Sequence, residues 1–168
     1  MPLRRVKCFV MDVDGTLTDG GLIVSSEGVE TKIFNVRDGF CMRHLHEAGI
    51  LTVIVSGRTS EAVEKRAREL GITEVHQGQE NKVEALTTIC KRHELGLFEM
   101  AYIGDDLNDL PAMRQVGFSF APADARDEVK EFANFVTKAR GGRGAVSEAA
   151  ERLLRAQGKW HQVLARYL

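Results

Sequence analysis

The stretch VKCFVMDVDGT, residues 6–16, decides the fold of this chain. Its first half is mostly apolar, rich in β-branched and aromatic side chains and too short for a helix, which predicts a buried strand over residues 6–11. Asp12 and Asp14 follow this strand directly, and Gly15 lets the chain turn sharply behind them. In an open α/β sheet the ligand site lies at the carboxyl ends of the strands, so both acids are expected at such a site.

Short apolar runs alternate with helical patterns through the rest of the chain. Further strands are expected at residues 51–55, 100–103 and 118–120, with a short edge strand at 135–136. Helices are expected between and after them, at residues 39–47, 60–70, 81–90, from 109, at 124–132 and at 145–156. This alternation predicts an α/β fold, a Rossmann-like doubly wound parallel sheet with helices on both faces.

One segment interrupts the alternation. Residues 22–24 and 29–34 are β-prone and enclose a polar, glycine-containing turn at 25–28. This pattern predicts a β-hairpin insertion after the first strand, at about residues 20–35.

The spacing of the polar motifs limits the domain organisation. The gaps from Asp14 to Ser56 and from Ser56 to Lys82 are too short to hold a separate cap domain. We therefore expect residues 1–168 to form one domain, with a C-terminal tail at about 157–168.

Composition and charge exclude several classes of function. Lys and Arg number 23 and Asp and Glu 24, so the chain lacks the basic excess of a nucleic-acid-binding protein. No apolar run approaches the ~20 residues that span a bilayer, and no membrane partner is expected. The three cysteines are far apart and predict neither a disulfide framework nor a zinc site. With no signal-peptide pattern at its start, the protein is expected to be cytoplasmic.

Charged and hydroxyl side chains follow the predicted strands at their ends. Asp12 and Asp14 follow the first strand, Ser56 the second, and Asp105 the third, while Lys82 lies at a helix start. Because the carboxyl ends of parallel strands meet at one crevice, these side chains are expected to lie close together. Gathered carboxylates repel one another unless a cation lies between them, and oxygen ligands without His or Cys favour Mg²⁺.

The two acids at positions 12 and 14 suit phosphoryl transfer. One carboxylate can attack phosphorus and form an acyl phosphate. The second can protonate the leaving oxygen and later activate water. The hydroxyl of Ser56 and the ammonium of Lys82 can hold the phosphoryl oxygens. Any one of these acids is equally compatible with a solvated loop, and the joint pattern carries the prediction.

Four motifs in order resemble those of the haloacid dehalogenase superfamily of phosphatases. They are DVDGT at 12–16, SGR at 56–58, Lys82 and GDDLND at 104–109. The resemblance implies that Asp12 is the nucleophile, Asp14 the general acid and base, and Ser56 and Lys82 the phosphate-binding groups. It also implies that Mg²⁺ is held by the Asp12 side chain, the Asp14 backbone carbonyl and Asp105, with Asp106 or Asp109 in support.

Further stretches resemble one branch of that superfamily, the 3-deoxy-D-manno-octulosonate 8-phosphate (Kdo 8-phosphate) phosphatases, which serve lipopolysaccharide synthesis. They are FNVRDG at 34–39, LGIT at 70–73, QGQ at 77–79, YIGDDL at 102–107, GGRGAV at 141–146 and AQGK at 156–159. The resemblance implies a small anionic sugar phosphate as substrate, with contacts from Asp14, Asn35, Arg37, Asp38, Gly39, Arg43, Arg58, Arg66 and Lys82. A cation at Arg58 suits the carboxylate of a sugar acid. The nonulosonate 9-phosphate phosphatases, which carry an acid at that position, are the alternative substrate class.

A neighbouring subunit is expected to close the site. An acyl phosphate gains from a dry, closed environment, and this chain has no cap domain of its own. The predicted hairpin offers strand edges for pairing between chains. Family members that resemble this chain form homotetramers through it, so a homotetramer is expected here.

Two alternatives come from other function classes. A receiver-like signalling module also combines acids, Mg²⁺, a hydroxyl and a lysine on a doubly wound sheet, but it carries its phospho-acceptor Asp where this chain has Ser56. A catalytically silent oligomerisation module is the second alternative. The presence of Asp12, Asp14, Lys82 and Asp105 gives no reason for such silence.

Overall fold

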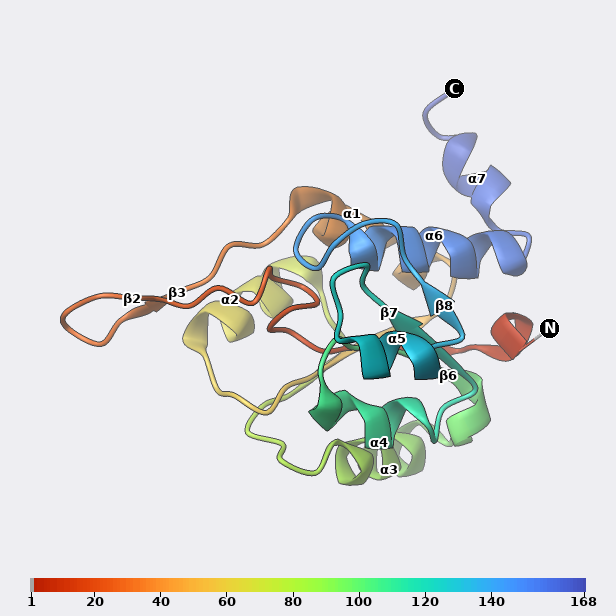
Figure 1. The fold of residues 1–168 in the computed structure, drawn as a ribbon. Helices are drawn as coiled ribbons and strands as arrows, with labels where there is room; N and C mark the ends of the chain where they lie inside the picture. The colour runs from red at the N-terminus through yellow and green to blue at the C-terminus, as the bar shows by residue number, and fades with distance from the viewer. Residues whose placement is uncertain (1) are drawn as a thin grey trace.

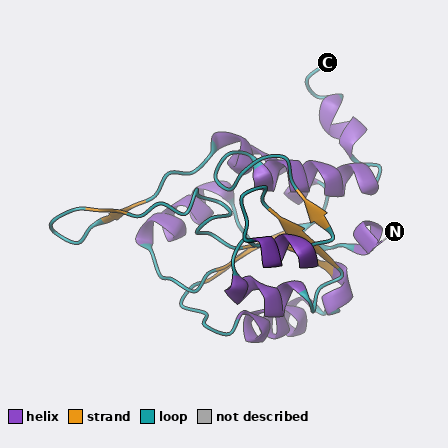
Figure 2. Ribbon diagram, in the orientation of Figure 1, coloured by secondary structure: helices purple, strands orange, loops and turns teal. Residues whose placement is uncertain are grey.

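The computed structural model describes residues 2–168, and a six-stranded parallel sheet forms its centre (Figures 1 and 2). The strands lie in the order β5-β4-β1-β6-β7-β8. Their bounds are β1 Cys8–Met11, β4 Leu51–Val55, β5 Glu74–His76, β6 Met100–Ile103, β7 Phe118–Ala121 and β8 Phe135–Val136. This arrangement confirms the predicted doubly wound fold, in which the strand order reverses at β1.

Helices cover both faces of the sheet (Figure 2). The α-helices are α1 Val36–Glu47, α2 Glu61–Leu70, α3 Lys82–His93, α4 Leu110–Met113, α5 Asp127–Phe132, α6 Ala145–Ala156 and α7 Trp160–Leu164. The 3₁₀ helices are η1 Pro2–Arg5, η2 Leu97–Glu99 and η3 Leu107–Asp109. Within the described part of the chain, no helix has the length and apolar composition needed to cross a bilayer.

Strand β1 is fully buried because its side chains alternate between two hydrophobic cores. Phe9 and Met11 face the core that α1, α2 and α6 cover. Cys8 and Val10 face the core that α3, α4 and α5 cover. A strand enclosed on both faces needs a continuous apolar run, which is why this segment contains no polar side chain until Asp12.

Local contacts set the starts of three helices, and two of these helices start elsewhere than the sequence predicts. Helix α1 begins earlier than predicted because the side chain of Asn35 accepts a hydrogen bond from the first turn and caps it. Helix α5 begins later, since the carboxylate of Asp124 accepts from the N–H of Gly141 at 2.8 Å instead of capping the helix. Ser60 occupies the N-cap position of α2, but its side chain makes no capping bond, and its N–H donates to Gln77.

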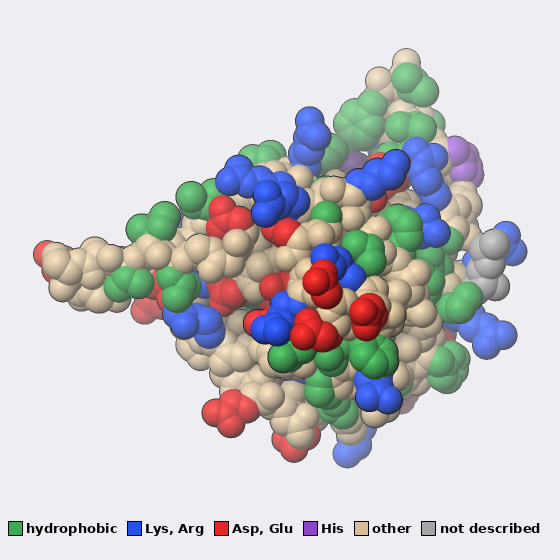
Figure 3. All heavy atoms as spheres, viewed as in Figure 1, with side chains coloured by type: hydrophobic (Ala, Val, Ile, Leu, Met, Phe, Trp, Pro, Cys, Tyr) green, Lys and Arg blue, Asp and Glu red, His purple; other side chains and the backbone are tan. Residues whose placement is uncertain are grey.

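The predicted β-hairpin is present and extends away from the sheet (Figure 1). Its strands, β2 Ile23–Val24 and β3 Glu30–Thr31, form a short antiparallel pair. Several of its apolar side chains are exposed, as Figure 3 shows along the projecting arm: Leu22, Ile23, Val24, Val29 and Ile33.

Candidate active site

The carboxyl ends of β1, β4 and β6 bring the predicted catalytic side chains to one edge of the sheet. Asp12 directly follows β1, Ser56 follows β4, and Asp105 lies just beyond β6. The pairing continues past the strand ends, because the N–H of Asp12 donates to the carbonyl of Ile103 at 3.0 Å. Asp12, Asp105 and Asp109 each place one carboxylate oxygen within 4.8 Å of the others.

Lys82 supplies positive charge to this acid cluster. It is the first residue of α3, whose N-terminus is capped by the side chain of Asn81. The ammonium donates to Oδ1 of Asp12 and to Oδ1 of Asp109, both at 2.6 Å, and the Lys82 side chain is 1% exposed. Burial alone would lower the pKa of Lys82, but the charges of the two acids outweigh burial and raise that pKa. The lysine therefore stays charged.

The carboxylate of Asp109 is occupied by groups of the protein. Its Oδ1 accepts from the lysine and from the hydroxyl of Tyr102 at 2.7 Å. Its Oδ2 accepts from the N–H groups of Asp105 and Asp106, at 3.0 and 3.2 Å. A Cβ at Gly104 would overlap this carboxylate. Asp109 thus fixes the loop that carries Asp105, while support of the metal ion by Asp106 or Asp109 stays a prediction.

Asp12 and Asp105 lie in an acid cluster in which Lys82 alone does not balance the negative charge of the carboxylates. Burial, followed by the charge of Asp109, raises the pKa of Asp12 well above its usual value, and Lys82 only partly opposes this. Burial and the same neighbouring charge raise the pKa of Asp105 to about 7. A divalent cation between the two would relieve this repulsion, and the donor set is all oxygen, as Mg²⁺ prefers. The residues present therefore fit a magnesium ion.

The loop after β1 is held against Asp105 from two sides. Gly15 has a φ of +92°, and a Cβ there would overlap the Asp105 carboxylate. The hydroxyl of Thr16 donates to Oδ1 of Asp105 at 3.1 Å. Behind the loop, the N–H of Gly142 donates to the carbonyl of Thr16 at 2.9 Å, and a Cβ at Gly141 would overlap the carbonyl of Gly15. The glycine-rich segment 141–144 thus braces the loop that follows Asp12.

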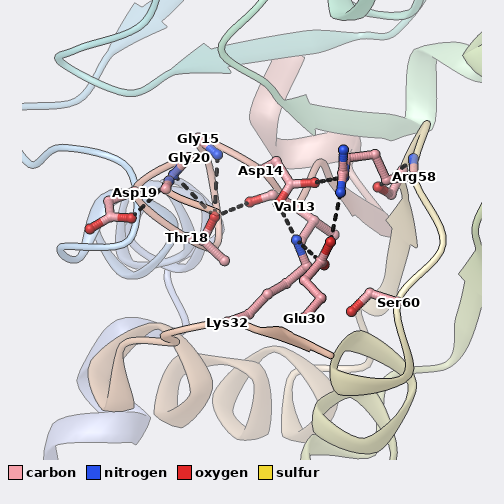
Figure 4. A network of polar contacts seen from close by, with 12 residues as sticks. Val13, Asp14, Gly15, Thr18, Asp19, Gly20, Glu30, Lys32, Arg58 and Ser60 are labelled. Carbon is pink, nitrogen blue, oxygen red and sulfur yellow. Dashed lines mark hydrogen bonds and ion pairs between the residues drawn. The ribbon is translucent and has the colours of Figure 1, made fainter. Parts of the chain in front are cut away.

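Asp14 belongs to a second charged group, the hairpin-base network, which consists of Asp14, Glu30, Lys32 and Arg58 (Figure 4). The Lys32 ammonium contacts Oδ1 of Asp14 and lies 3.0 Å from Glu30. Arg58 donates from Nη2 to Glu30 at 2.6 Å, and its Nε lies 3.7 Å from Oδ2 of Asp14. The hydrogen bonds from Lys32 and Arg58 lower the pKa of Glu30 to about 2. The N–H of Arg58 also donates to the hydroxyl of Ser56 at 3.3 Å. The predicted phosphate-binding hydroxyl of Ser56 and the predicted substrate contact Arg58 therefore lie in one turn.

The predicted substrate contacts at the start of α1 have local roles. Asn35 caps the helix by accepting from the N–H of Arg37 at 2.8 Å, and Arg37 itself is exposed. The buried Asp38 carboxylate accepts from the N–H groups of Ser147 at 2.7 Å and Gly144 at 3.1 Å, at the N-terminus of α6. Because both oxygens are engaged there, a substrate contact from Asp38 would have to come from its backbone.

Gly39, Arg43 and Arg66 line a groove of about 680 Å³ between α1 and α2. Arg66 fills the space that a side chain at Gly39 would occupy. Arg43 is largely exposed and lies 3.5 Å from Glu47, and Arg66 lies 3.3 Å from Glu69. The residues lining this groove include none of the acids at the sheet edge.

Sequence reasoning missed four residues that shape the site: Thr16, Glu30, Lys32 and Tyr102. Thr16 and Tyr102 both lie in motifs that carry the family resemblance, but the sequence alone assigns neither of them a role. Glu30 and Lys32 alternate with Val29, Thr31 and Ile33 in the hairpin, a pattern typical of a strand with one solvated face. Only the path of the hairpin back to Asp14 reveals their contacts.

Several known proteins are similar to this chain in sequence and in structure. Residues 71–149 match a family model described as haloacid dehalogenase-like hydrolase. The chain is 43% identical over 156 residues to the 3-deoxy-D-manno-octulosonate 8-phosphate phosphatase KdsC of Escherichia coli K12, covering 93% of this chain and 83% of that protein.

Two solved structures are similar over nearly the whole fold. The 3-deoxy-D-manno-octulosonate 8-phosphate phosphatase of Moraxella catarrhalis, in complex with magnesium, phosphate and Kdo, has a TM-score of 0.97 and 41% identity, covering 99% of this chain and 96% of that one. The cobalt-bound phosphatase of Haemophilus influenzae has a TM-score of 0.92 and 39% identity, covering 95% and 94%. The chain belongs to the Kdo 8-phosphate phosphatase family of haloacid dehalogenase-like hydrolases.

Proposed function

We propose that this protein is a magnesium-dependent phosphatase that hydrolyses Kdo 8-phosphate to Kdo and inorganic phosphate through an aspartyl-phosphate on Asp12. The observation that carries the proposal is the buried cluster in which Lys82 joins Asp12 and Asp109 beside Asp105. The substrate is inferred from the names of the relatives, which act on this sugar-acid phosphate.

The reaction divides into two displacements at phosphorus. A carboxylate oxygen of Asp12 forms a bond to phosphorus while the bond to the sugar oxygen breaks, and Asp14 gives its proton to that leaving oxygen. Asp14 then accepts a proton from a water molecule, whose oxygen displaces the Asp12 carboxylate and releases inorganic phosphate. Asp14 thus ends the cycle protonated, as it began.

The surrounding groups balance the charge of the phosphoryl oxygens. Lys82 and the hydroxyl of Ser56 would bind these oxygens, and Lys82 also keeps the Asp12 carboxylate oriented through its 2.6 Å hydrogen bond. Asp12, Asp105 and the Asp14 backbone carbonyl would hold Mg²⁺, which supplies further positive charge to the transferring group. Arg58 would bind the substrate carboxylate.

We further propose that four copies assemble through the hairpin and that a neighbour completes each site. The exposed apolar side chains on the hairpin support association, because a two-stranded ribbon gains stability only by burying such a face. Arg43 and Arg66 lie in a groove apart from the acid cluster. They would therefore contact a substrate bound to a neighbouring subunit.

Substrate profiling tests the proposal. Purified protein is incubated with Kdo 8-phosphate, a nonulosonate 9-phosphate and p-nitrophenyl phosphate, with Mg²⁺ or with a chelator, and phosphate release is measured. We expect Kdo 8-phosphate to give the highest kcat/KM and the chelator to abolish release. Faster turnover of the nine-carbon substrate would reassign the sugar. Absence of release from all three would favour the silent or receiver-like alternatives.

A further inference from the structure

The base of the hairpin returns to the active-site edge and places two charged side chains against two predicted functional groups. Glu30 and Lys32 flank a single residue of the hairpin and, through their side chains, reach Arg58 and Asp14 (Figure 4). This hairpin-base network matches two basic side chains, Lys32 and Arg58, with two acidic ones, Asp14 and Glu30. Such matching indicates that the hairpin is built to hold these two groups as well as to meet other subunits.

We propose that Glu30 and Lys32 are positioning residues of the active site: Glu30 sets Arg58 for the substrate carboxylate, and Lys32 sets Asp14 for proton transfer. This inference rests on the proposed function, because it deepens the roles given there to Arg58 and Asp14.

Glu30 acts on a side chain that would otherwise be mobile. The Arg58 side chain is 51% exposed and extends from a turn, so without an anion beside it the guanidinium would sample many rotamers. Glu30 holds Nη2 at 2.6 Å. A guanidinium has five donors, and one hydrogen bond to Glu30 leaves others for a second carboxylate. Glu30 therefore preorganises Arg58 and leaves it able to bind the substrate.

Lys32 acts on one oxygen of Asp14. Its side chain is 1% exposed, and its ammonium contacts Oδ1 of Asp14 while Glu30 lies at 3.0 Å on its other side. Oδ2 of Asp14 is only loosely approached, at 3.7 Å from Nε of Arg58. The lysine thus fixes the carboxylate plane through one oxygen and leaves the other to exchange a proton with the leaving group or water.

The variant Glu30→Ala tests whether Glu30 positions Arg58, and Glu27→Ala is the matched control. Glu27 is an exposed residue of the same hairpin turn, and no ion pair holds its side chain among the described residues. Loss of a charge-assisted hydrogen bond predicts that Glu30→Ala raises KM for Kdo 8-phosphate roughly tenfold, with kcat within about twofold. Turnover of p-nitrophenyl phosphate, which has no carboxylate to meet Arg58, should be unchanged. Affinity for Kdo itself should fall in parallel with the KM effect.

A double-mutant cycle shows whether Glu30 acts through Arg58. If it does, Glu30→Ala adds no more than about a twofold loss to the Arg58→Ala variant. Losses that multiply, or equal losses on both substrates, would overturn this half of the inference. Light scattering shows whether the alanine variant alters folding or assembly. If it does, the cycle is repeated with Glu30→Gln, which keeps the side-chain volume.

The variant Lys32→Met tests whether Lys32 positions Asp14 for proton transfer. We expect kcat for Kdo 8-phosphate to fall at least about tenfold with KM nearly constant, because Asp14 is misplaced for proton transfer. The loss on p-nitrophenyl phosphate should be smaller, since nitrophenolate leaves readily without a proton. Lys32→Arg should recover part of kcat, and Lys65→Met on the exposed face of α2 is the control. An unchanged kcat in Lys32→Met would contradict the role of Lys32.

The wild-type protein separates failure of this inference from failure of the proposed function. Wild-type protein that releases phosphate from neither substrate overturns both. An active wild type whose Glu30 and Lys32 variants behave like the controls overturns the positioning roles alone.

Discussion

Replacement of Lys82 by methionine should strongly destabilise the protein as well as inactivate it. The change removes the ammonium that donates to Asp12 and Asp109 at 2.6 Å and leaves a hydrophobic side chain of similar length. Asp109 keeps its bonds from Tyr102 and two backbone N–H groups, whereas Asp12 loses its ion-pair partner. Removing one member of a buried ion pair costs about 3–5 kcal/mol. For a chain of this size that predicts a fall in the melting temperature of roughly 6–20 °C.

The assay is urea unfolding at pH 7.5 with a chelator present, for wild type, Lys82→Met and the exposed control Lys65→Met. We expect the control to stay within about 0.5 kcal/mol of wild type. Added Mg²⁺ should restore part of the lost stability, because a cation bound only to the folded state stabilises it by about 2.7 kcal/mol at 100 times its Kd. A Lys82→Met protein within about 1 kcal/mol of wild type would refute the view that Lys82 neutralises a buried acid pair.

Three further predictions follow from the same geometry. Asp12→Asn should abolish phosphate release while thermal unfolding remains close to that of wild type, because Lys82 keeps Asp109 as its ion-pair partner, and appreciable residual turnover would rule out the assigned nucleophile. Asp38→Ala should lower the free energy of unfolding by about 1–2 kcal/mol, because it removes the carboxylate that caps α6, whereas the exposed Asp127→Ala should change it by less than about 0.5 kcal/mol; equal effects in urea unfolding would contradict the capping role. In chelator, stability should fall as pH rises from 5 to 8, because the raised pKa of Asp105, about 7, makes the folded state bind the proton more tightly than the unfolded chain does; Mg²⁺ should flatten this dependence, and a flat profile in chelator would contradict the raised pKa.

The fold was largely predictable because its central strands carry a strong signal. Residues 8–11 and 100–103 are buried on both faces, so their sequences are unbroken apolar runs. Strand β5 escaped prediction because it is a three-residue edge strand that begins with Glu74 and ends with His76. The carboxylate of Glu74 forms hydrogen bonds with the side chains of Arg92 and His93 in α3, and these contacts exist only in the folded structure.

The site was predictable to the extent that strand ends determine it. Asp12 and Asp105 follow strands that pair directly, so their proximity follows from topology. The side chain of Asp38 could not be placed in this way, because its partners lie at the N-terminus of α6, more than a hundred residues away along the chain. Lys32 likewise reaches Asp14 only because of the direction in which the hairpin leaves the sheet.

The central position of β1 also bears on how the enzyme forms in the cell. Its two neighbours begin at residues 51 and 100, so β1, which is synthesised before both, acquires its second partner only after residue 100 has been made. Until then one edge of an entirely apolar segment stays open to other chains, which exposes the nascent protein to aggregation. Recovery of phosphate release during refolding would accordingly report that both edges of β1 are paired, since Asp12 has no fixed position before then.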